Sequence, residues 1–509
     1  MTVVNQRPNP SRSEQTYKLH PFAWPPVVLA SAATVTLLMA YAGRYGYHRD
    51  ELYFLSCAKR MAWGFVDQPP VTPLIAKISQ AIAPWSLVVL RMWPALFSAA
   101  SIVLAALCAR EFGAGRLGQT ATAIALAIAP GILAGGHMLS TATLDITLWT
   151  AVTVLVLRLL CTGNPRLWPA IGAVLGVGLL NKWTIGFLVA GLLVGILAGP
   201  ERRLLASGWF AAGVAVALVL WAPNLWWQAQ HDWPQVEMLT VIQGRSSGVG
   251  ETFSWIPLQF AITGFAATPL WIAGLWRVLR SDDARPFRAL GIAYVVLAVG
   301  LAIVAGDKPY YVAALYLPLV AAGAVPFERW WTRNAGRVRR VVVPAVLALL
   351  TVAGYPIVLP ILPASALADV PLQEVNYDLG EQIGWPTFVS QIEEAWAQIP
   401  PAERATAIVL TGNYGEAGAI ERYGTSLPTP YSGHVTWWWW RTPPEDTTTV
   451  LAVGLPESYL RRFFDELEPV GRLDNGLDID TEEQGNPLII ARGPKEPLPA
   501  MWRDLRHYT

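Results

Sequence analysis

The chain has 509 residues, of which 53% are hydrophobic and only 14% charged, whereas an ordinary soluble domain carries roughly 25% charged residues. Its formal net charge of +1 gives no basic excess, which argues against nucleic acid as a partner. The three cysteines, Cys57, Cys108 and Cys161, lie far apart and in no metal-binding spacing. Most of the chain is therefore predicted to lie in a membrane, with no structural metal.

The N-terminal tail, residues 1–25, is polar and contains proline. It lacks the small-residue cleavage site that follows the apolar core of a signal peptide. We therefore expect the first apolar run to be a retained span and the tail to be cytoplasmic.

Long apolar runs follow one another over residues 26–360. A bilayer core about 30 Å thick needs roughly 20 apolar residues per helix. That length predicts about eleven transmembrane helices. The expected spans are 26–43, 86–108, 117–136, 141–161, 167–181, 184–199, 207–224, 256–276, 288–305, 310–327 and 340–360.

Basic residues are concentrated in every second loop, for example in "WRVLRSDDARPFR" and "ERWWTRNAGRVRR". Because short loops rich in Lys and Arg remain in the cytoplasm, this bias sets the orientation. The loops that begin at residues 44, 137, 225 and 306 are then expected to face outward, together with residues 361–509.

The first outward loop, residues 44–85, begins with "RYGYHRDELYF" and places Asp50 beside Glu51. An ionised carboxylate near a bilayer is costly, so it usually has a partner, a watery cavity or a functional role. Aromatic neighbours raise the cost of an unpaired charge. Alternatively, the pair simply marks the end of a span in a solvated loop. "DQPP" at 67–70 is expected to end any helix there and to shape the loop.

Further polar residues are predicted at the outer ends of spans. Asp145 lies in "HMLSTATLDITLW", and a first-turn acid can also be satisfied by the helix dipole. His137 could contact a phosphate or be structural. Lys182 follows Asn181 where two apolar runs meet. It is a candidate functional residue, or it simply extends its ammonium group to the membrane interface.

Two more outward loops carry candidates. In "GDKPYY", one proline separates Lys308 from Tyr310 and Tyr311. The segment "NLWWQAQHDWPQ" contains His231 among aromatic residues that could stack on a sugar. An interfacial aromatic belt is the alternative explanation for that segment.

Residues 361–509 change in character, because the long apolar runs stop. "TAIVLTG", "TTVLAVGL" and "NPLIIARG" are typical of strands, and "YGEAGAIERYG" and "PESYLRRFFDELEPVG" of amphipathic helices. These patterns predict a soluble α/β domain of ordinary size. It contains no nucleotide-binding glycine motif. On a strand, alternate side chains of the tetrad Trp437–Trp440 would point to opposite faces, so two of the four would need another surface, such as the membrane or the acceptor.

The first-loop sequence "YGYHRDELYFLSCAKRMAWGFVDQPPVTPLIAKI" resembles the corresponding loop of the GT-C glycosyltransferases of family 39. Shorter segments support the resemblance, namely "LDITLWT", "GLLNKWT" and "GDKPYY". The resemblance implies a polytopic α-helical membrane protein with a soluble C-terminal α/β domain on the outer side. It also implies a glycosyltransferase that takes a sugar from a polyprenyl phosphate without a cofactor.

The resemblance assigns expected roles to the candidates. Asp50 would be the catalytic base, because an inverting transfer needs a base within reach of the acceptor hydroxyl. Glu51 and Asp145 would complete the catalytic group. The departing phosphate needs cationic stabilisation, which is expected from Arg49, Lys182, Lys308 and His137. Substrate contacts are expected from Tyr47, His48, Tyr310, Tyr311 and His231.

Two other functional classes remain open at this point. A flippase or secondary transporter would carry polar residues in mid-span and broken helices related by a repeat, whereas the acids and bases here gather on one side. A non-catalytic binding relative is the second alternative. For an enzyme, the expected acceptor is an envelope lipid, glycan or protein, and the expected location is a bacterial inner membrane.

Overall fold

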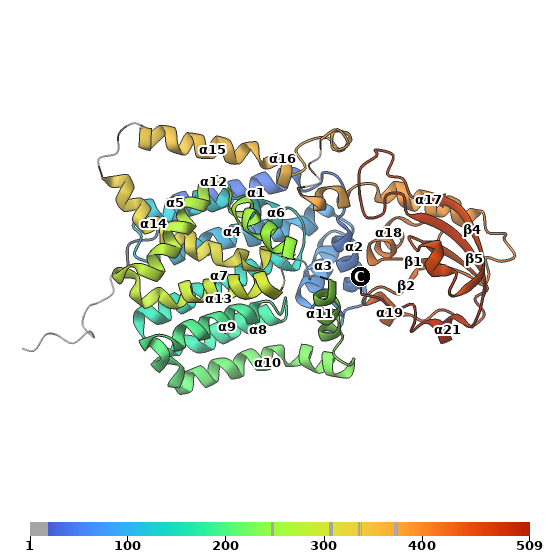
Figure 1. The fold of residues 1–509 in the computed structure, drawn as a ribbon, viewed down its shortest axis with the longest axis horizontal. Helices are drawn as coiled ribbons and strands as arrows, with labels where there is room; N and C mark the ends of the chain where they lie inside the picture. The colour runs from blue at the N-terminus through green and yellow to red at the C-terminus, as the bar shows by residue number, and fades with distance from the viewer. Residues whose placement is uncertain are drawn as a thin grey trace, which may run out of the picture.

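The computed structural model describes residues 19–508 except 246–248, 305–308, 334–335, 337, 371 and 373–374. Within these residues, six helices are long and apolar enough to cross a membrane, or up to eight if two bent pairs each form one span. The protein is therefore a multi-pass membrane protein. Its helices form an elongated bundle, and residues 376–508 form a separate domain at one end of the bundle, which we call the outer domain from its position (Figure 1).

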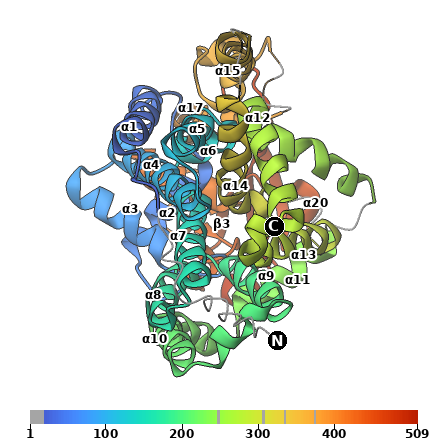
Figure 2. The ribbon, with the colours of Figure 1, turned by 90° about the vertical axis from the view of Figure 1, so that its left-hand side faces the viewer.

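The bundle is built largely from contacts between helices that are not sequence neighbours, such as α12 with α14, α8 with α10, α9 with α13 and α4 with α7. Viewed from the end opposite the outer domain, α15 lies at one periphery and α10 at the other (Figure 2). The bundle helices are α1 Trp24–Tyr41, α4 Leu87–Glu111, α5 Arg116–Ala127, α6 Pro130–His137, α7 Thr141–Thr162, α8 Trp168–Leu179, α9 Ile185–Leu197, α10 Gly208–Gln230, α12 Val249–Arg280, α13 Arg288–Val304, α14 Ala313–Thr332, α15 Val343–Ala353 and α16 Tyr355–Val358.

The six to eight candidate spans among the described residues are fewer than the eleven expected, and several differ in detail. The span expected at 117–136 is bent by 54° between α5 and α6, where Pro130 starts a new helix. The run at 340–360 is divided into a π-helical turn, Val338–Val342, followed by α15 and α16. Pro344 at the start of α15 and Pro356 at the start of α16 account for these restarts, because proline favours the first helical turn.

Between the bundle and the outer domain lie three shorter helices (Figure 1). The first outward loop forms α2, Arg49–Lys59, and α3, Val71–Ile82, and the segment after α10 forms α11, Pro234–Arg245. Most of α2 is buried, because the outer domain covers the side that faces away from the bundle.

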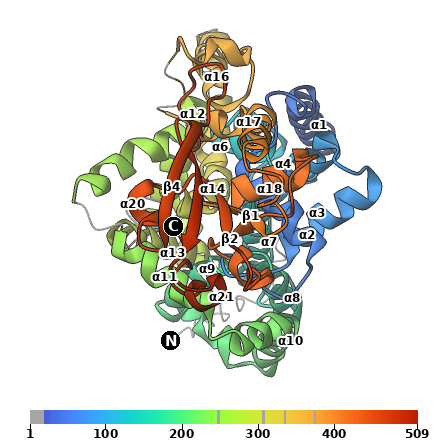
Figure 3. The ribbon, with the colours of Figure 1, turned by 90° about the vertical axis from the view of Figure 1, so that its right-hand side faces the viewer.

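The outer domain contains a five-stranded mixed sheet in the order β2-β1-β3-β5-β4. β1 pairs in parallel with both β2 and β3, and β5 is antiparallel to β3 and β4. Figure 3 shows this sheet from the outer end of the molecule. The strands are β1 Ala407–Thr411, β2 Tyr431–Ser432, β3 Thr449–Val453, β4 Phe464–Arg472 and β5 Pro487–Pro494.

The two faces of the sheet bury different partners. Alternate residues such as Val409 and Leu451 face α17, Trp385–Ala397, and α18, Tyr414–Tyr423, in a cluster that continues into α2. The other alternation, which includes Ile408 and Val450, packs on residues of α20, Glu457–Leu460, and α21, Leu498–Met501. The sheet is therefore covered on both faces, and its α18 side is the side that meets the membrane domain.

Two expectations for the outer domain were wrong. The segment 456–471 is not one amphipathic helix, because α20 ends at Leu460 and β4 begins at Phe464. Pairing with β5 satisfies the backbone hydrogen-bonding groups of β4. A short isolated helix would be only marginally stable in comparison. The tetrad Trp437–Trp440 forms a helical turn, α19, and not a strand, so its four indoles point in different directions around one axis.

Candidate active site

The acidic pair of the first loop lies in the first turn of α2, whose start is fixed by a reciprocal cap. The N–H of Asp50 donates to His48 Nδ1 at 3.2 Å, and Glu51 accepts from the N–H of His48 at 2.9 Å. Such a cap provides acceptors for two backbone N–H groups that have no partner within the helix at its N-terminus. The cap also sends the two carboxylates of Asp50 and Glu51 in different directions.

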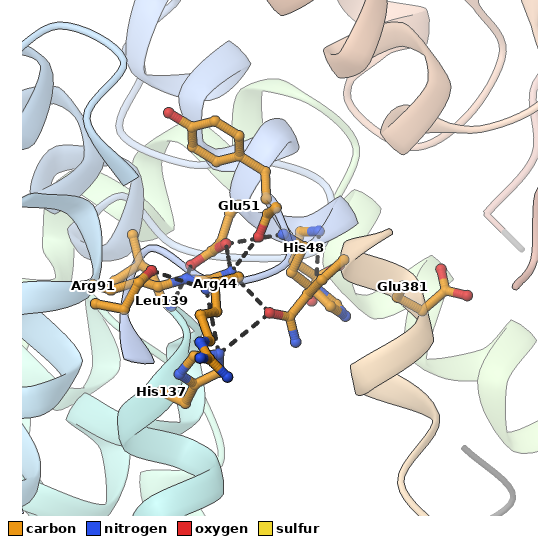
Figure 4. A network of polar contacts seen from close by, with 12 residues as sticks. Arg44, His48, Glu51, Arg91, His137, Leu139 and Glu381 are labelled. Carbon is orange, nitrogen blue, oxygen red and sulfur yellow. Dashed lines mark hydrogen bonds and ion pairs between the residues drawn. The ribbon is translucent and has the colours of Figure 1, made fainter. Parts of the chain in front are cut away.

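Glu51 is completely buried and is held by Arg91 of α4, itself 1% exposed. The guanidinium of Arg91 donates from Nε to Glu51 Oε1 at 3.0 Å and from Nη2 to Oε2 at 2.8 Å. The N–H of Leu139 donates to Oε1 at 3.0 Å. Figure 4 shows these groups converging. Glu51 therefore joins the first loop to α4 and to the segment between α6 and α7.

Arg91 also organises the backbone around it. It donates to the carbonyl oxygens of Ala42 and Gly46 at 3.1 and 2.6 Å. Its Nη1 lies 3.3 Å from His137 Nε2, and its Nη2 donates to Gln382 Oε1 at 3.1 Å (Figure 4). His137 is thus buried in this network.

Asp50 has a different environment, because its partner comes from the outer domain. The hydroxyl of Tyr414, the first residue of α18, donates to Asp50 Oδ1 at 2.7 Å. Asp50 is only partly buried. Within the described part of the chain, Oδ2 of Asp50 makes no hydrogen bond. One carboxylate oxygen is therefore fixed and the other is available.

A second acid of the first loop lies nearby. Asp67, in "DQPP", accepts a hydrogen bond from the Tyr53 hydroxyl at 2.6 Å. Burial, reinforced by the charge of Asp50, raises the pKa of Asp67 to about 7 despite that bond. The rings of Tyr53 and Tyr414 lie 4.8 Å apart. Each of the two acids is thus held by one of two adjacent tyrosines.

Arg49 enters a group of glutamates on the outer domain, which we call the acidic socket: Glu381, Glu416, Glu482 and Glu483. Arg49 forms an ion pair with Glu482 and lies 3.7 Å from Glu381. In Figure 4 the Glu381 carboxylate points away from Arg91. Burial raises the pKa of Glu416 to about 7. Burial and the charge of Glu381 raise that of Glu483 as well. The socket is therefore a cluster of carboxyl groups around one guanidinium.

Asp145 and Lys182 lie together at the outer ends of bundle helices. Asp145 accepts from Trp149 Nε1 at 3.0 Å and from Thr184 Oγ1 at 2.7 Å. The charge of Lys182 acts on Asp145, and the Lys182 ammonium lies 5.3 Å from the centre of the Tyr311 ring. The structure therefore brings together three residues that the sequence predicted separately.

This second group is connected to the first loop through Asn181. Thr72 of α3 donates to Asn181 Oδ1 at 3.0 Å, and Asn181 donates to the Thr141 carbonyl at 2.9 Å. The N–H of Val71 also donates to the Leu180 carbonyl at 3.1 Å. The "NKW" turn and the "DQPP" turn are therefore neighbours.

The remaining predicted residues have varied positions. The hydroxyl of Tyr47 donates to the Trp85 carbonyl at 2.6 Å, and His48 Nε2 lies 3.5 Å from Asp378. His231 stacks on Trp227, with ring centres 4.0 Å apart, and meets the edge of Trp439. Lys308 and the side chain of Tyr310 lie outside the described residues.

The sequence identified most of the acidic residues of the site but not the residues that pair with them. Arg91 lies near the start of an expected span, where an arginine can extend to the interface or pair with a loop acid, and in the structure it pairs with Glu51. Asp67 was treated as part of a turn, although a second acid in the same outward loop was a usable signal. Among the described residues, no group of three or more His, Cys, Asp or Glu side chains could hold a metal ion.

The fold resembles that of known glycosyltransferases. ArnT from Cupriavidus metallidurans, solved with bound undecaprenyl phosphate, superposes with a TM-score of 0.59 over 91% of this chain and 97% of that chain, at 16% identity. The arabinofuranosyltransferase AftD from Mycobacteria gives a TM-score of 0.50 over 94% of this chain and 40% of that chain, at 15% identity. The architecture is therefore the GT-C fold.

The sequence comparisons agree with the fold. Residues 67–227 match the family described as dolichyl-phosphate-mannose-protein mannosyltransferase. A curated relative, the lipid A galacturonosyltransferase RgtD of Rhizobium johnstonii (strain DSM 114642 / LMG 32736 / 3841), is 27% identical over 248 residues, which are 46% of this chain and 50% of the relative. The chain thus spans about half the length of the curated relative that it matches.

Proposed function

We propose that the protein transfers a sugar from a polyprenyl-phosphate donor to an envelope lipid, glycan or protein on the outer face of a bacterial inner membrane. The fold, the family and the position of Asp50 support this proposal together. ArnT binds undecaprenyl phosphate and RgtD acts on lipid A, which makes a lipid acceptor the first to test.

The observation that carries the proposal is the contrast between Asp50 and Glu51. Both oxygens of Glu51 are occupied by Arg91 and by backbone N–H groups. Using Glu51 as a base would break a buried ion pair, which costs several kcal/mol. Asp50 has one oxygen held by Tyr414 and one available. Asp50 is therefore the base in this proposal.

The step is an inverting displacement at the anomeric carbon. The acceptor hydroxyl oxygen forms the new bond to that carbon while its proton passes to Asp50 Oδ2. The bond from the anomeric carbon to the phosphate oxygen breaks, and polyprenyl phosphate departs with the electron pair. Because the leaving group is already anionic, it requires a cation more than a proton.

Lys182 is the described residue best placed to supply that cation. Asp145 lies beside it and Tyr311 beneath it. Trp183, the next residue, lines an apolar cavity of about 420 Å³ between α7, α8, α9 and α10. An apolar cavity beside a lysine suits a prenyl chain with a phosphate at its head. Lys308 stays a second candidate on the basis of sequence. Arg49 has no such role in this scheme, because it is engaged in the acidic socket.

The test compares three strains by mass spectrometry of envelope lipids, glycans and proteins: one with the intact gene, one lacking it, and one carrying Asp50→Asn. The proposal expects the same sugar to be lost from the same acceptor in the last two strains. An unchanged envelope in the deletion strain would contradict the proposed function. Loss in the deletion strain alone would contradict only the role of Asp50.

A further inference from the structure

We propose that Tyr414 is a positioning residue for Asp50, so that the soluble outer domain completes the catalytic centre in the first loop of the membrane domain. This inference rests on the proposed function, because it assumes that Asp50 is the base. It assigns to the outer domain a role in the chemical step, beyond covering the membrane domain.

The Tyr414 hydroxyl can act as a donor because it stays protonated. Burial, followed by the negative charge of Asp50, raises the pKa of Tyr414 well above its usual value. Its hydrogen bond to Asp50 Oδ1 is 2.7 Å long. A hydrogen bond to an ionised acceptor is shorter and stronger than one between neutral groups. The bond therefore sets the orientation of the carboxylate and leaves Oδ2 available.

The Tyr414 ring is held from several sides. His434 stacks on it at 4.9 Å with an interplanar angle of 14°, and Tyr53 lies 4.8 Å away. The Arg49 guanidinium lies 5.0 Å from the ring centre. The N–H of Tyr414 donates to His434 Nδ1 at 3.3 Å. Burial and the charges of His507 and Arg49 lower the pKa of His434 well below its usual value, so its Nδ1 remains an acceptor.

The helix that carries Tyr414 is fixed against α2. Gly415 and Gly418 face α2, and a Cβ on Gly418 would lie only 2.9–3.1 Å from Leu52 atoms. This close approach holds because neither glycine has a side chain. Arg49, the residue before Asp50, is anchored in the acidic socket. Two independent contacts therefore fix the distance between the start of α18 and Asp50.

The test is a set of kinetic measurements on the purified full-length protein with the donor found in the envelope experiment. Tyr414→Phe keeps the ring and its stacking and removes only the donor. We expect kcat to fall about 10-fold with KM for the donor unchanged. We also expect the acidic limb of the pH–rate profile to move to higher pH, because a hydrogen bond to a carboxylate favours its ionised form.

Two controls separate positioning from a structural effect. Tyr459→Phe alters a tyrosine whose hydroxyl contacts only the Asp504 carbonyl at 3.5 Å among the described residues, and it should retain wild-type kinetics. In an Asp50→Asn background, Tyr414→Phe should lower the residual rate less than twofold, since the two residues act as one unit. An equal loss in both backgrounds, or wild-type kinetics in the single variant, would overturn the inference. An inactive wild-type protein would instead overturn the proposed function.

Discussion

Arg91 holds Glu51 through two nearly parallel hydrogen bonds of 3.0 and 2.8 Å inside the protein. This ion pair joins the first outward loop to α4 and orients the start of α2. The neighbouring acid, Asp50, is thereby left at the boundary with the outer domain. Two acids that look equivalent in the sequence thus have different environments, because both oxygens of Glu51 are paired whereas Asp50 has one oxygen held by Tyr414.

Glu51→Gln should destabilise the fold, because it leaves Arg91 buried with an unmatched charge. Removing one partner of a buried ion pair costs about 3–5 kcal/mol. Thermal unfolding of the purified protein in detergent measures the effect. Asp50→Asn is the matched control and should unfold near the wild-type temperature. Equal unfolding temperatures for all three proteins would contradict the structural role of Glu51.

Asp67 should give the activity a dependence on pH near neutrality. Its raised pKa of about 7 places its ionisation where the enzyme would work, and it lies close enough to Asp50 to affect it. We expect the pH–rate profile of wild type to bend near pH 7 and that of Asp67→Asn to lack the bend. A bend of the same size in the variant would assign the ionisation to another group.

The sequence predicted the acids of the site but not the pairs they form. "HRDEL" identified Asp50 and Glu51, since charged residues next to a span are unusual. Which of the two is buried depends on Arg91, 40 residues later, and on Tyr414, 364 residues later in a separate domain. Local patterns contain no information on such contacts. The strand pattern of "TAIVLTG" did predict β1. The helix predicted at 456–471 was wrong, because the pairing of β4 with β5 is not local in the sequence.

The acidic socket should make stability depend on pH. The pKa of Glu416 is raised from 4.5 to about 7, so the folded state keeps a proton that the unfolded state loses. Stability contributed by this group is therefore full below about pH 4.5 and falls as pH rises toward 7. Glu416→Gln retains an acceptor for the Gly412 and Asn413 N–H groups and should reduce this fall.

Thermal unfolding between pH 5 and pH 8 checks the socket prediction, over the range set by the Glu416 pKa. Glu445→Gln, at an exposed position, is the control and should follow the wild-type curve. If the Glu416 variant also follows the wild-type curve, the pKa of Glu416 is not raised in the folded protein, and the prediction is wrong.

Gly418→Ala should loosen the contact between the outer domain and α2. A methyl group there would lie 2.9 Å from Leu52 Cβ and 3.0 Å from its backbone carbon, so the helices must separate. We expect a lower kcat and faster hydrogen exchange in α2, with α4 unaffected. Gly300→Ala is a suitable control, because its Cβ would meet nothing within 4 Å. Wild-type exchange in α2 of the Gly418 variant would contradict this description of the interface.

The most direct test of the central claim is the rate of sugar transfer by purified Asp50→Asn protein beside wild type, with folding verified by thermal unfolding. A general base typically contributes about 10²- to 10⁴-fold. The account predicts a loss of at least about 100-fold with the fold intact. Transfer at the wild-type rate by the folded variant would contradict it.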